Sequence, residues 1–421
     1  MIFQFFSFLK NNHLEYCLIN GYKEVIFNNN NTDSDTDILF KQKDFLKIEK
    51  IVKQFCRMND LQMVQVLHHD LWAKNIFLYN SENTEFLNLD LYGELSRKEV
   101  VFFDEKEIFD TLETYENILI LSGEKEFINY LIKKIDKSDL SKENFEHLRS
   151  LYLKSKSECR KALSQFFPNK HKLIEQAFSD DQYDDIVNNI PELANDFYSV
   201  KTLDSKRWFL NRLRTIKRIV SPTGLTISFL GPDGSGKSTV INELMDTRLP
   251  FRRKDYFHLK PIKTKPSSSD NEMVEDPHKY PPYSKLKSYM KLMYFIYQYN
   301  MGWIKNILPL KIRSSLVIFD RYFDDLLVDS RRYRYGGSLM VAKLARVFIP
   351  KPDIYFILTT DPKVIYERKQ EVPFEELERQ VEAYNALADG KQYFQIDVDR
   401  SPEEITKEIV TIMMEKMNER Y

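Results

Sequence analysis

Residues 231–238 read GPDGSGKS, and this stretch constrains the fold of the 421-residue chain more than any other. Gly231, Gly236, Lys237 and Ser238 fit the spacing G-x-x-x-x-G-K-[ST]. An apolar run, LTISFL, precedes the motif, and a helical pattern, STVINELM, overlaps its end and continues beyond it. A loop between a strand and a helix can turn its N–H groups and the helix N-terminus toward phosphate oxygens. We therefore predict a P-loop within a parallel α/β domain.

The P-loop predicts an ATP site with a bound Mg²⁺ ion. Lys237 can reach the β- and γ-phosphates, and the hydroxyl of Ser238 can ligate Mg²⁺. The alternative is a glycine-rich turn that binds nothing, but such a turn does not require the strand and helix on either side. The predicted cofactor-binding residues are Gly231, Asp233, Gly234, Ser235, Gly236, Lys237, Ser238 and Thr239.

A second apolar run, SSLVIF, ends in Asp320-Arg321-Tyr322. An aspartate at the carboxyl end of a neighbouring strand can hold the metal and its water shell, so Asp320 is a predicted metal residue together with Ser238. Arg321 can clamp an anionic acceptor. A helix cap is the alternative role of Asp320.

These motifs and the segment KPDIYFILTTDPKVIYERKQE at 351–371 resemble the thymidylate kinase family over about residues 225–421. Asp233 matches an acidic residue in the P-loop of that family, and residues 320–322 match its D-R-Y. Glu367 and Arg368 match a Glu-Arg pair before the family's mobile lid. The resemblance implies a P-loop kinase fold, use of ATP and Mg²⁺, and four catalytic residues: Lys237, Asp320, Arg321 and Arg368.

The acceptor segment departs from the family pattern. Arg331, Arg332 and Arg334 stand where the family has neutral contacts to the base, and the lid, RKQEVP, is short. With Asp233 and Arg321, these three arginines are the predicted substrate residues. They favour an acceptor with several phosphates or carboxylates over thymidylate. A solvated loop is the alternative.

Carboxylates also mark the N-terminal part. Asp35 and Asp37 enter one apolar strand two residues apart, and Asp90 lies in a second strand. Three such carboxylates can hold Mg²⁺ around a triphosphate, so they are predicted metal residues. The pattern resembles the nucleotidyltransferase fold of the polymerase-β-like superfamily over about residues 10–105, although Tyr22 stands where that family has a serine. Simple Asp-rich turn chemistry is the alternative.

We expect an α/β protein of three parts. These are a nucleotidyltransferase-like α+β domain (1–110), a helical region with a linker helix (111–220), and a thymidylate kinase-like P-loop domain with a parallel sheet (221–421). The net charge of −1 gives no global attraction for polyanions. The three scattered cysteines form no metal or disulfide pattern, which fits a cytoplasmic protein. Residues 288–308 are too polar to span a bilayer. The sequence does not decide between a monomer and a homodimer.

The sequence thus predicts a phosphotransferase of the nucleoside-monophosphate-kinase type that acts on a nucleotide or an anionic sugar. The N-terminal domain can couple this step to nucleotidyl transfer, and the tandem resembles bacterial proteins that accompany surface-polysaccharide genes. A nucleic-acid end-processing enzyme is one alternative, because residues 201–220 carry seven basic side chains. We rank nucleic acid below a small molecule. The third hypothesis is an NTP-binding regulatory protein with an inactive N-terminal domain.

Overall fold

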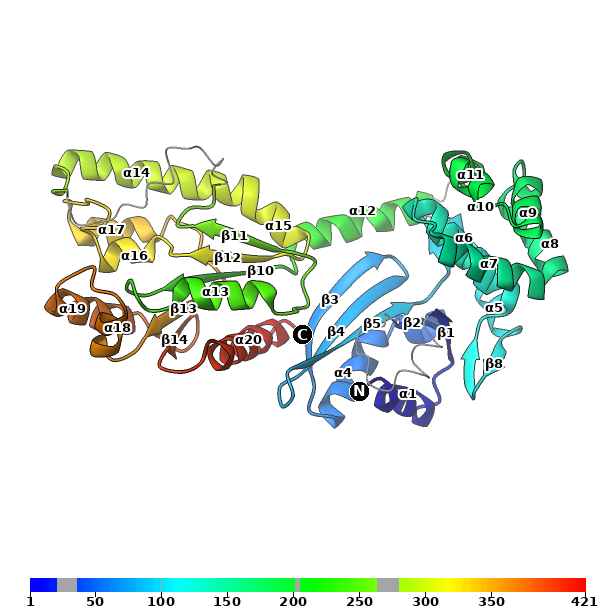
Figure 1. Ribbon diagram of the computed structural model, residues 1–421, viewed down its shortest axis with the longest axis horizontal. Coiled ribbons are helices and arrows are strands. Elements are labelled where there is room, and N and C mark those ends of the chain that lie inside the picture. Colours follow the sequence, from blue (N-terminus) through cyan, green and yellow to red (C-terminus); the bar gives the residue numbers. More distant parts are fainter. Residues whose placement is uncertain (21–35, 99, 201–204, 263–279) are drawn as a thin grey trace. The chain divides into compact units, whose positions relative to one another are not determined.

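The computed structural model describes residues 1–20, 36–98, 100–200, 205–262 and 280–421. The chain divides into two compact units (Figure 1). The N-terminal unit comprises residues 1–80 and 85–215, and the C-terminal unit comprises residues 81–84 and 216–421. Asp35, Gly21, Tyr22 and most of the segment 263–282 lie outside the described residues. The predicted boundaries at residues 110 and 220 stay predictions.

Within the described residues, the N-terminal unit holds a seven-stranded mixed sheet of order β3-β4-β5-β2-β1-β9-β8. The sequence predicts strands at the short runs EYCLIN, TDILF, MVQVL, NIFLYN and EFLNLDLYG, and each of these runs forms a strand of the sheet. The strands are β1 (Tyr16–Asn20), β2 (Thr36–Phe40), β3 (Gln62–Asp70), β4 (Ala73–Asn80), β5 (Glu85–Tyr92), β8 (Glu113–Tyr115) and β9 (Ile118–Ile120). β2 pairs in parallel with β5, while β3, β4 and β5 form an antiparallel meander. A short hairpin, β6 (Ser96–Arg97) with β7 (Val100–Val101), follows the sheet.

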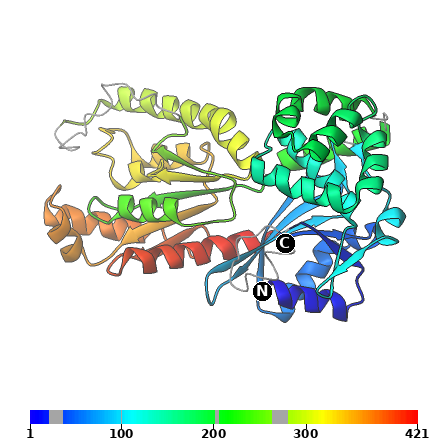
Figure 2. The same cartoon turned by 45° about the vertical axis from the view of Figure 1, so that its right-hand side comes forward.

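The helices of the N-terminal unit cover the sheet. The first are α1 (Ile2–Asn11), α3 (Gln42–Phe45), α4 (Ile48–Met58) and α5 (Glu105–Phe109). The predicted helical region forms α6 (Gly123–Lys137), α7 (Lys142–Lys154), α8 (Lys156–Phe166), α9 (His171–Asp180), α10 (Tyr183–Asn188) and α11 (Ile190–Ser199). Figure 2 shows these later helices gathered on one side of the blue sheet. One hydrophobic cluster joins Cys17 and Leu39 of the sheet to Phe127, Phe145 and Phe178 of the helices. The sheet and the helical region therefore share a core.

Helix α12 (Ser205–Val220) carries the boundary between the units, and none of its residues is fully buried. Phe209, Leu213, Ile216 and Val220, which the sequence places on one apolar face, are 45–75% exposed. Charged contacts hold the first half of the helix instead. Arg207 binds Glu94, an ion pair in which both side chains are largely buried.

The C-terminal unit is built on a parallel sheet, as predicted. Its five described strands have the order β11-β12-β10-β13-β14. They are β10 (Leu225–Leu230), β11 (Lys254–His258), β12 (Leu316–Asp320), β13 (Ile354–Thr359) and β14 (Tyr393–Asp397), and all pair in parallel. The near-continuous burial of β10, β12 and β13 follows from helices on both faces. In Figure 1, α13 (Lys237–Asp246) and α20 (Pro402–Asn418) cover one face, and α14 (Lys285–Gly302) lies over the other.

Short helices complete this unit. They are η1 (Trp303–Ile307), α15 (Leu308–Ile312), α16 (Asp324–Val328), α17 (Leu339–Arg346), α18 (Pro362–Arg368) and α19 (Phe374–Asn385). Helix α14 buries one stripe, which includes Leu292, Phe295 and Tyr299, and exposes Met290 and Met293 on the other side. Among the described residues, no helix combines the length and the apolar character that a membrane crossing requires.

Candidate active site

The P-loop connects β10 to α13 at the carboxyl edge of the parallel sheet. Gly231 (φ +143°) and Gly236 (φ +79°) adopt backbone conformations that favour glycine. A Cβ atom at Gly231 would lie 2.4 Å from the carbonyl oxygen of Leu358 on β13, so the close approach of two strands also requires glycine there. The loop ends at the first turn of α13, where Ser238 and Thr239 are exposed. The N–H groups of a helix start are thus open to a phosphate.

Lys237 is only 7% exposed. Its Nζ donates hydrogen bonds to the carbonyl oxygens of Gly231 (2.9 Å) and Pro232 (2.8 Å). Burial, and then the positive charge of Arg321, lower the pKa of Lys237 to about 7. A bound polyphosphate would place negative charge next to this ammonium group and would stabilise its charged form.

Asp320 is the last residue of β12 and lies directly beside Phe229 of β10. Tyr256 donates a hydrogen bond to its Oδ2 (3.1 Å). Its Oδ1 is buried and accepts no hydrogen bond from any described residue. Burial tends to raise the pKa of this carboxyl, but the nearby imidazole of His258, 3.8 Å from Oδ2, and the charge of Lys237 outweigh burial and hold the pKa below its ordinary value. An ionised carboxylate with a free buried oxygen fits the predicted role of Asp320 as a metal residue.

Arg321 is 5% exposed and has φ +67°, which is unfavourable for a residue with a side chain. Its Nη1 donates to both carboxylate oxygens of Asp325 (2.8 and 2.9 Å), and its Nη2 binds Asp233 of the P-loop. Asp325 also accepts hydrogen bonds from Tyr333 (2.6 Å) and Tyr384. Three donors on one fully buried carboxylate fix Arg321 against the P-loop.

Arg332 brings a second guanidinium group to the same place. Its Nη2 binds Asp233 and lies 3.8 Å from Glu371, and its Nε lies 3.4 Å from Asp329. Asp233 therefore lies between Arg321 and Arg332, which are separated from it by 88 and 99 residues in the sequence. Because Arg321 and Arg332 both bind the carboxylate of Asp233, the same two guanidinium groups can bind another anionic group.

Known proteins resemble this unit. The family model for thymidylate kinase matches residues 229–409. The C-terminal region is thus similar to thymidylate kinases, and this similarity supports a P-loop kinase phosphotransferase. A curated relative, described as a probable thymidylate kinase of Methanosarcina barkeri (strain Fusaro / DSM 804), is 28% identical over 211 residues, which are 46% of this chain and 97% of the relative.

Two solved thymidylate kinases also match the kinase-like part. The enzyme of Candida albicans is 16% identical, over 46% of this chain and 93% of its own, with a TM-score of 0.34. The enzyme of Ehrlichia chaffeensis is 20% identical, over 45% of this chain and 98% of its own, with a TM-score of 0.32. The predicted kinase class is confirmed by the family model and the curated relative. The family model does not cover the N-terminal unit.

Within the kinase-like domain, the other predicted residues lie in separate places. Arg368 donates to the carbonyl oxygen of Val398 (3.2 Å) rather than to a P-loop residue. Arg331 is exposed. Arg334 lies over the ring of Tyr283 (4.2 Å to the centroid) and donates to the Pro281 carbonyl (3.1 Å). Of Arg331, Arg332 and Arg334, Arg332 forms an ion pair with Asp233 of the P-loop in the described part of the chain.

Asp325, Tyr333, Tyr384 and Glu371 were missed as site residues. Asp325 follows Arg321 by four residues, a spacing that brings side chains together on a helical turn, and this was an available signal. Nothing in the local sequence connects Glu371 with Arg332.

In the N-terminal unit, Asp37 and Asp90 are register partners on the parallel strands β2 and β5, so both side chains project from one face. Asp37 is 4% exposed and forms an ion pair with Lys133 of α6 (3.0 Å). Burial first, and then the charges of Asp37 and Asp90, raise the pKa of Tyr92 well above its ordinary value. Asp35, the third predicted carboxylate, lies outside the described residues, so the metal set of three stays a prediction. The described residues contain no group of three or more His, Cys, Asp or Glu that could hold a metal.

Proposed function

We propose that the thymidylate kinase-like domain transfers the γ-phosphoryl group of ATP to a small anionic acceptor, a nucleotide or a sugar phosphate. The observation that carries this proposal is the placement of Asp233 between Arg321 and Arg332. The two guanidinium groups reach the same carboxylate at the edge of the P-loop, although Asp325, Asp329 and Glu371 also contact them. An acceptor phosphate could displace the carboxylate of Asp233 from Arg332, because both are anions that accept charge-assisted hydrogen bonds.

The P-loop residues have separate roles in this proposal. Lys237 would leave the carbonyl oxygens of the loop and bind the β- and γ-phosphate oxygens, where charge develops during transfer. Ser238 and Asp320 would hold Mg²⁺, which neutralises phosphate charge when it is bound. The buried, unpartnered Oδ1 of Asp320 supports this assignment.

The acceptor class can be tested by phosphotransfer from γ-labelled ATP to nucleoside monophosphates and sugar phosphates. We expect thymidylate to be a poor acceptor compared with a more anionic compound. Arg332→Ala should raise the KM for the acceptor about tenfold or more, with the KM for ATP nearly unchanged. Arg331→Ala should raise the KM for the acceptor less than Arg332→Ala does, since Arg331 is exposed on the same loop. Fast turnover of thymidylate, at about 1–100 per second, or an acceptor KM unaffected by Arg332→Ala, would contradict the proposed acceptor class.

The catalytic assignments are tested by three further variants. Lys237→Ala should abolish phosphoryl transfer, and Asp320→Asn should remove its metal dependence without unfolding the domain. Arg321→Ala should mainly weaken acceptor binding. If Arg321→Ala changed only the affinity for ATP, the assignment of Arg321 to the acceptor would be wrong.

We also propose that the N-terminal unit transfers a nucleotidyl group, with Asp35, Asp37 and Asp90 as metal residues. The pairing of Asp37 with Asp90 on one sheet face supports this second activity. Asp37→Asn should abolish pyrophosphate release from an NTP and leave the phosphotransfer of the P-loop domain intact. The ion pair with Lys133 gives the competing explanation, a structural carboxylate. Pyrophosphate release at the wild-type rate in Asp37→Asn would favour that explanation.

A further inference from the structure

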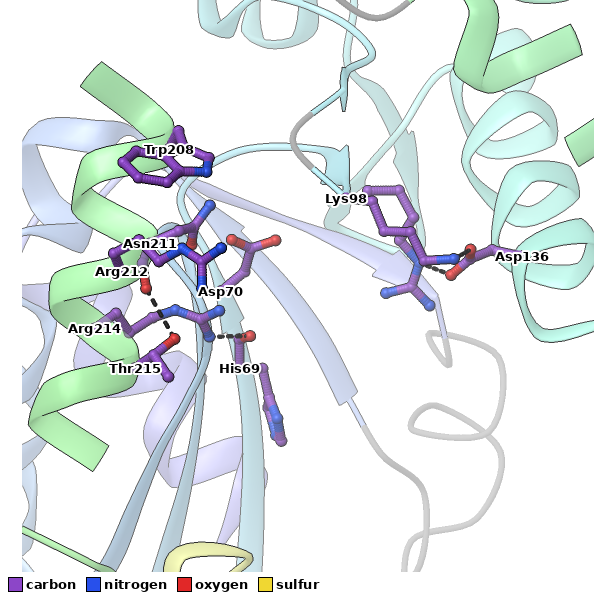
Figure 3. Close-up of a pocket in the computed structure, with 10 residues that line it drawn as sticks. His69, Asp70, Lys98, Asp136, Trp208, Asn211, Arg212, Arg214 and Thr215 are labelled. Carbon is purple, nitrogen blue, oxygen red and sulfur yellow. Dashed lines mark hydrogen bonds and ion pairs between the residues drawn. The ribbon is translucent and has the colours of Figure 1, made fainter. Parts of the chain in front are cut away.

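A cavity of about 480 Å³ opens within the N-terminal unit (Figure 3). Its volume lies in the range of about 300–1,000 Å³ that small-molecule sites occupy. One wall is the first part of α12 together with the end of β3, and the opposite wall is the β6–β7 hairpin with the end of α6. The lining residues are His69, Asp70, Arg97, Lys98, Asp136, Trp208, Asn211, Arg212, Arg214 and Thr215.

The lining carries an excess of positive charge. Four arginine and lysine side chains face two carboxylates, those of Asp70 and Asp136. Lys98 (2.6 Å) and Arg97 (3.5 Å) share the single carboxylate of Asp136. The Nη1 of Arg214 donates to the backbone carbonyl oxygens of His68 (2.9 Å) and His69, and these neutral acceptors do not compensate the charge of the guanidinium group. The cavity therefore attracts an anion.

Trp208 adds a flat apolar surface to this charge. Its side chain is 53% exposed, and the guanidinium group of Arg212 lies 5.2 Å from its ring centroid. No carboxylate among the described residues forms an ion pair with Arg212. In Figure 3, Trp208 and Arg212 lie on the α12 wall of the cavity. An exposed indole next to an arginine can stack a planar ring and bind a phosphate at the same time.

We infer that this cavity binds a small molecule that combines a planar ring with phosphate, of the nucleoside-phosphate class. Trp208 stacks the ring, while Arg212 and the Arg97–Lys98 pair bind the phosphate oxygens. Arg97 also lines the small cavity that contains Asp37, so the two cavities share this residue. The site requires no catalytic role for Asp37, and it is separate from the ATP site proposed at the P-loop.

The test uses the full-length chain and the probes AMP, UMP, UDP, inorganic phosphate and a 5′-phosphorylated single-stranded hexanucleotide. Tryptophan fluorescence and calorimetry measure the binding of each probe. Trp208→Phe isolates the signal of this one indole, because Trp72 and Trp303 remain. Arg212→Ala removes an exposed side chain, so it should not affect folding, which circular dichroism checks. Lys217→Ala is the matched control on the same helix, outside the cavity lining.

At least one nucleoside phosphate should quench the fluorescence of Trp208, and Trp208→Phe should remove that quench. The Kd of this nucleoside phosphate should rise about tenfold in Arg212→Ala, as expected for loss of a charge-assisted hydrogen bond. The same Kd should stay unchanged in Lys217→Ala. Three results would overturn the inference. They are no quench of Trp208 by any nucleoside phosphate, equal affinity for inorganic phosphate, and a hexanucleotide that binds ten times more tightly than every free nucleotide.

Discussion

Asp325→Asn tests whether a buried carboxylate holds the kinase site together. Asp325 is fully buried and accepts from Arg321, Tyr333 and Tyr384. The amide keeps the shape of the side chain but removes its charge, which leaves the guanidinium group of Arg321 buried with Asp233 as its remaining ionic partner. Removing one partner of a buried ion pair costs about 3–5 kcal/mol. Because Asp233 still contributes, we expect about 3 kcal/mol of lost stability in the C-terminal unit.

Hydrogen exchange of the strands β10, β12 and β13 in the full-length chain measures this loss. About 3 kcal/mol corresponds to an acceleration of roughly a hundredfold for amides that exchange through unfolding of the unit. Tyr333→Phe is the matched variant, because it removes one hydrogen bond to the same carboxylate and no charge. It should accelerate exchange only about fivefold, or roughly 1 kcal/mol. If Asp325→Asn accelerated exchange no more than Tyr333→Phe does, the charge of Asp325 would not stabilise the site.

Three further predictions concern the P-loop and its neighbours. Gly231→Ala should abolish ATP binding measured by calorimetry, because its Cβ would lie 2.4 Å from the Leu358 carbonyl oxygen; normal binding would contradict this. Arg321→Gly should be about 1 kcal/mol more stable to urea than Arg321→Ala, since φ +67° favours glycine, and equal stability would argue against backbone strain. Burial, helped by Arg321, lowers the pKa of Lys237 to about 7, so its ammonium group is lost as the pH rises through 7. ATP affinity should therefore fall about fivefold from pH 7 to pH 8, and Lys237→Met should lack this dependence.

The local sequence was sufficient for the elements that carry the kinase chemistry. The P-loop and the strand that ends in Asp320 were predicted from short patterns, because a strand followed by a glycine-rich turn and a helix is specified by neighbouring residues. The five strand runs of the N-terminal part and the parallel sheet of the C-terminal part were predicted in the same way. The kinase class then followed from the family resemblance, and the family model confirms it.

The tertiary structure decided which side chains meet. Asp233 and Arg332 are 99 residues apart, and their contact depends on the path of an acceptor loop that no local pattern specifies. Periodicity showed that α12 has an apolar face but not whether another element covers it, and that face is exposed. The pairing of Asp37 with Asp90 depends on strand register, which the sheet as a whole determines. The cavity beside Trp208 exists because segments distant in the sequence pack around it, so its charge could not be read from any one of them.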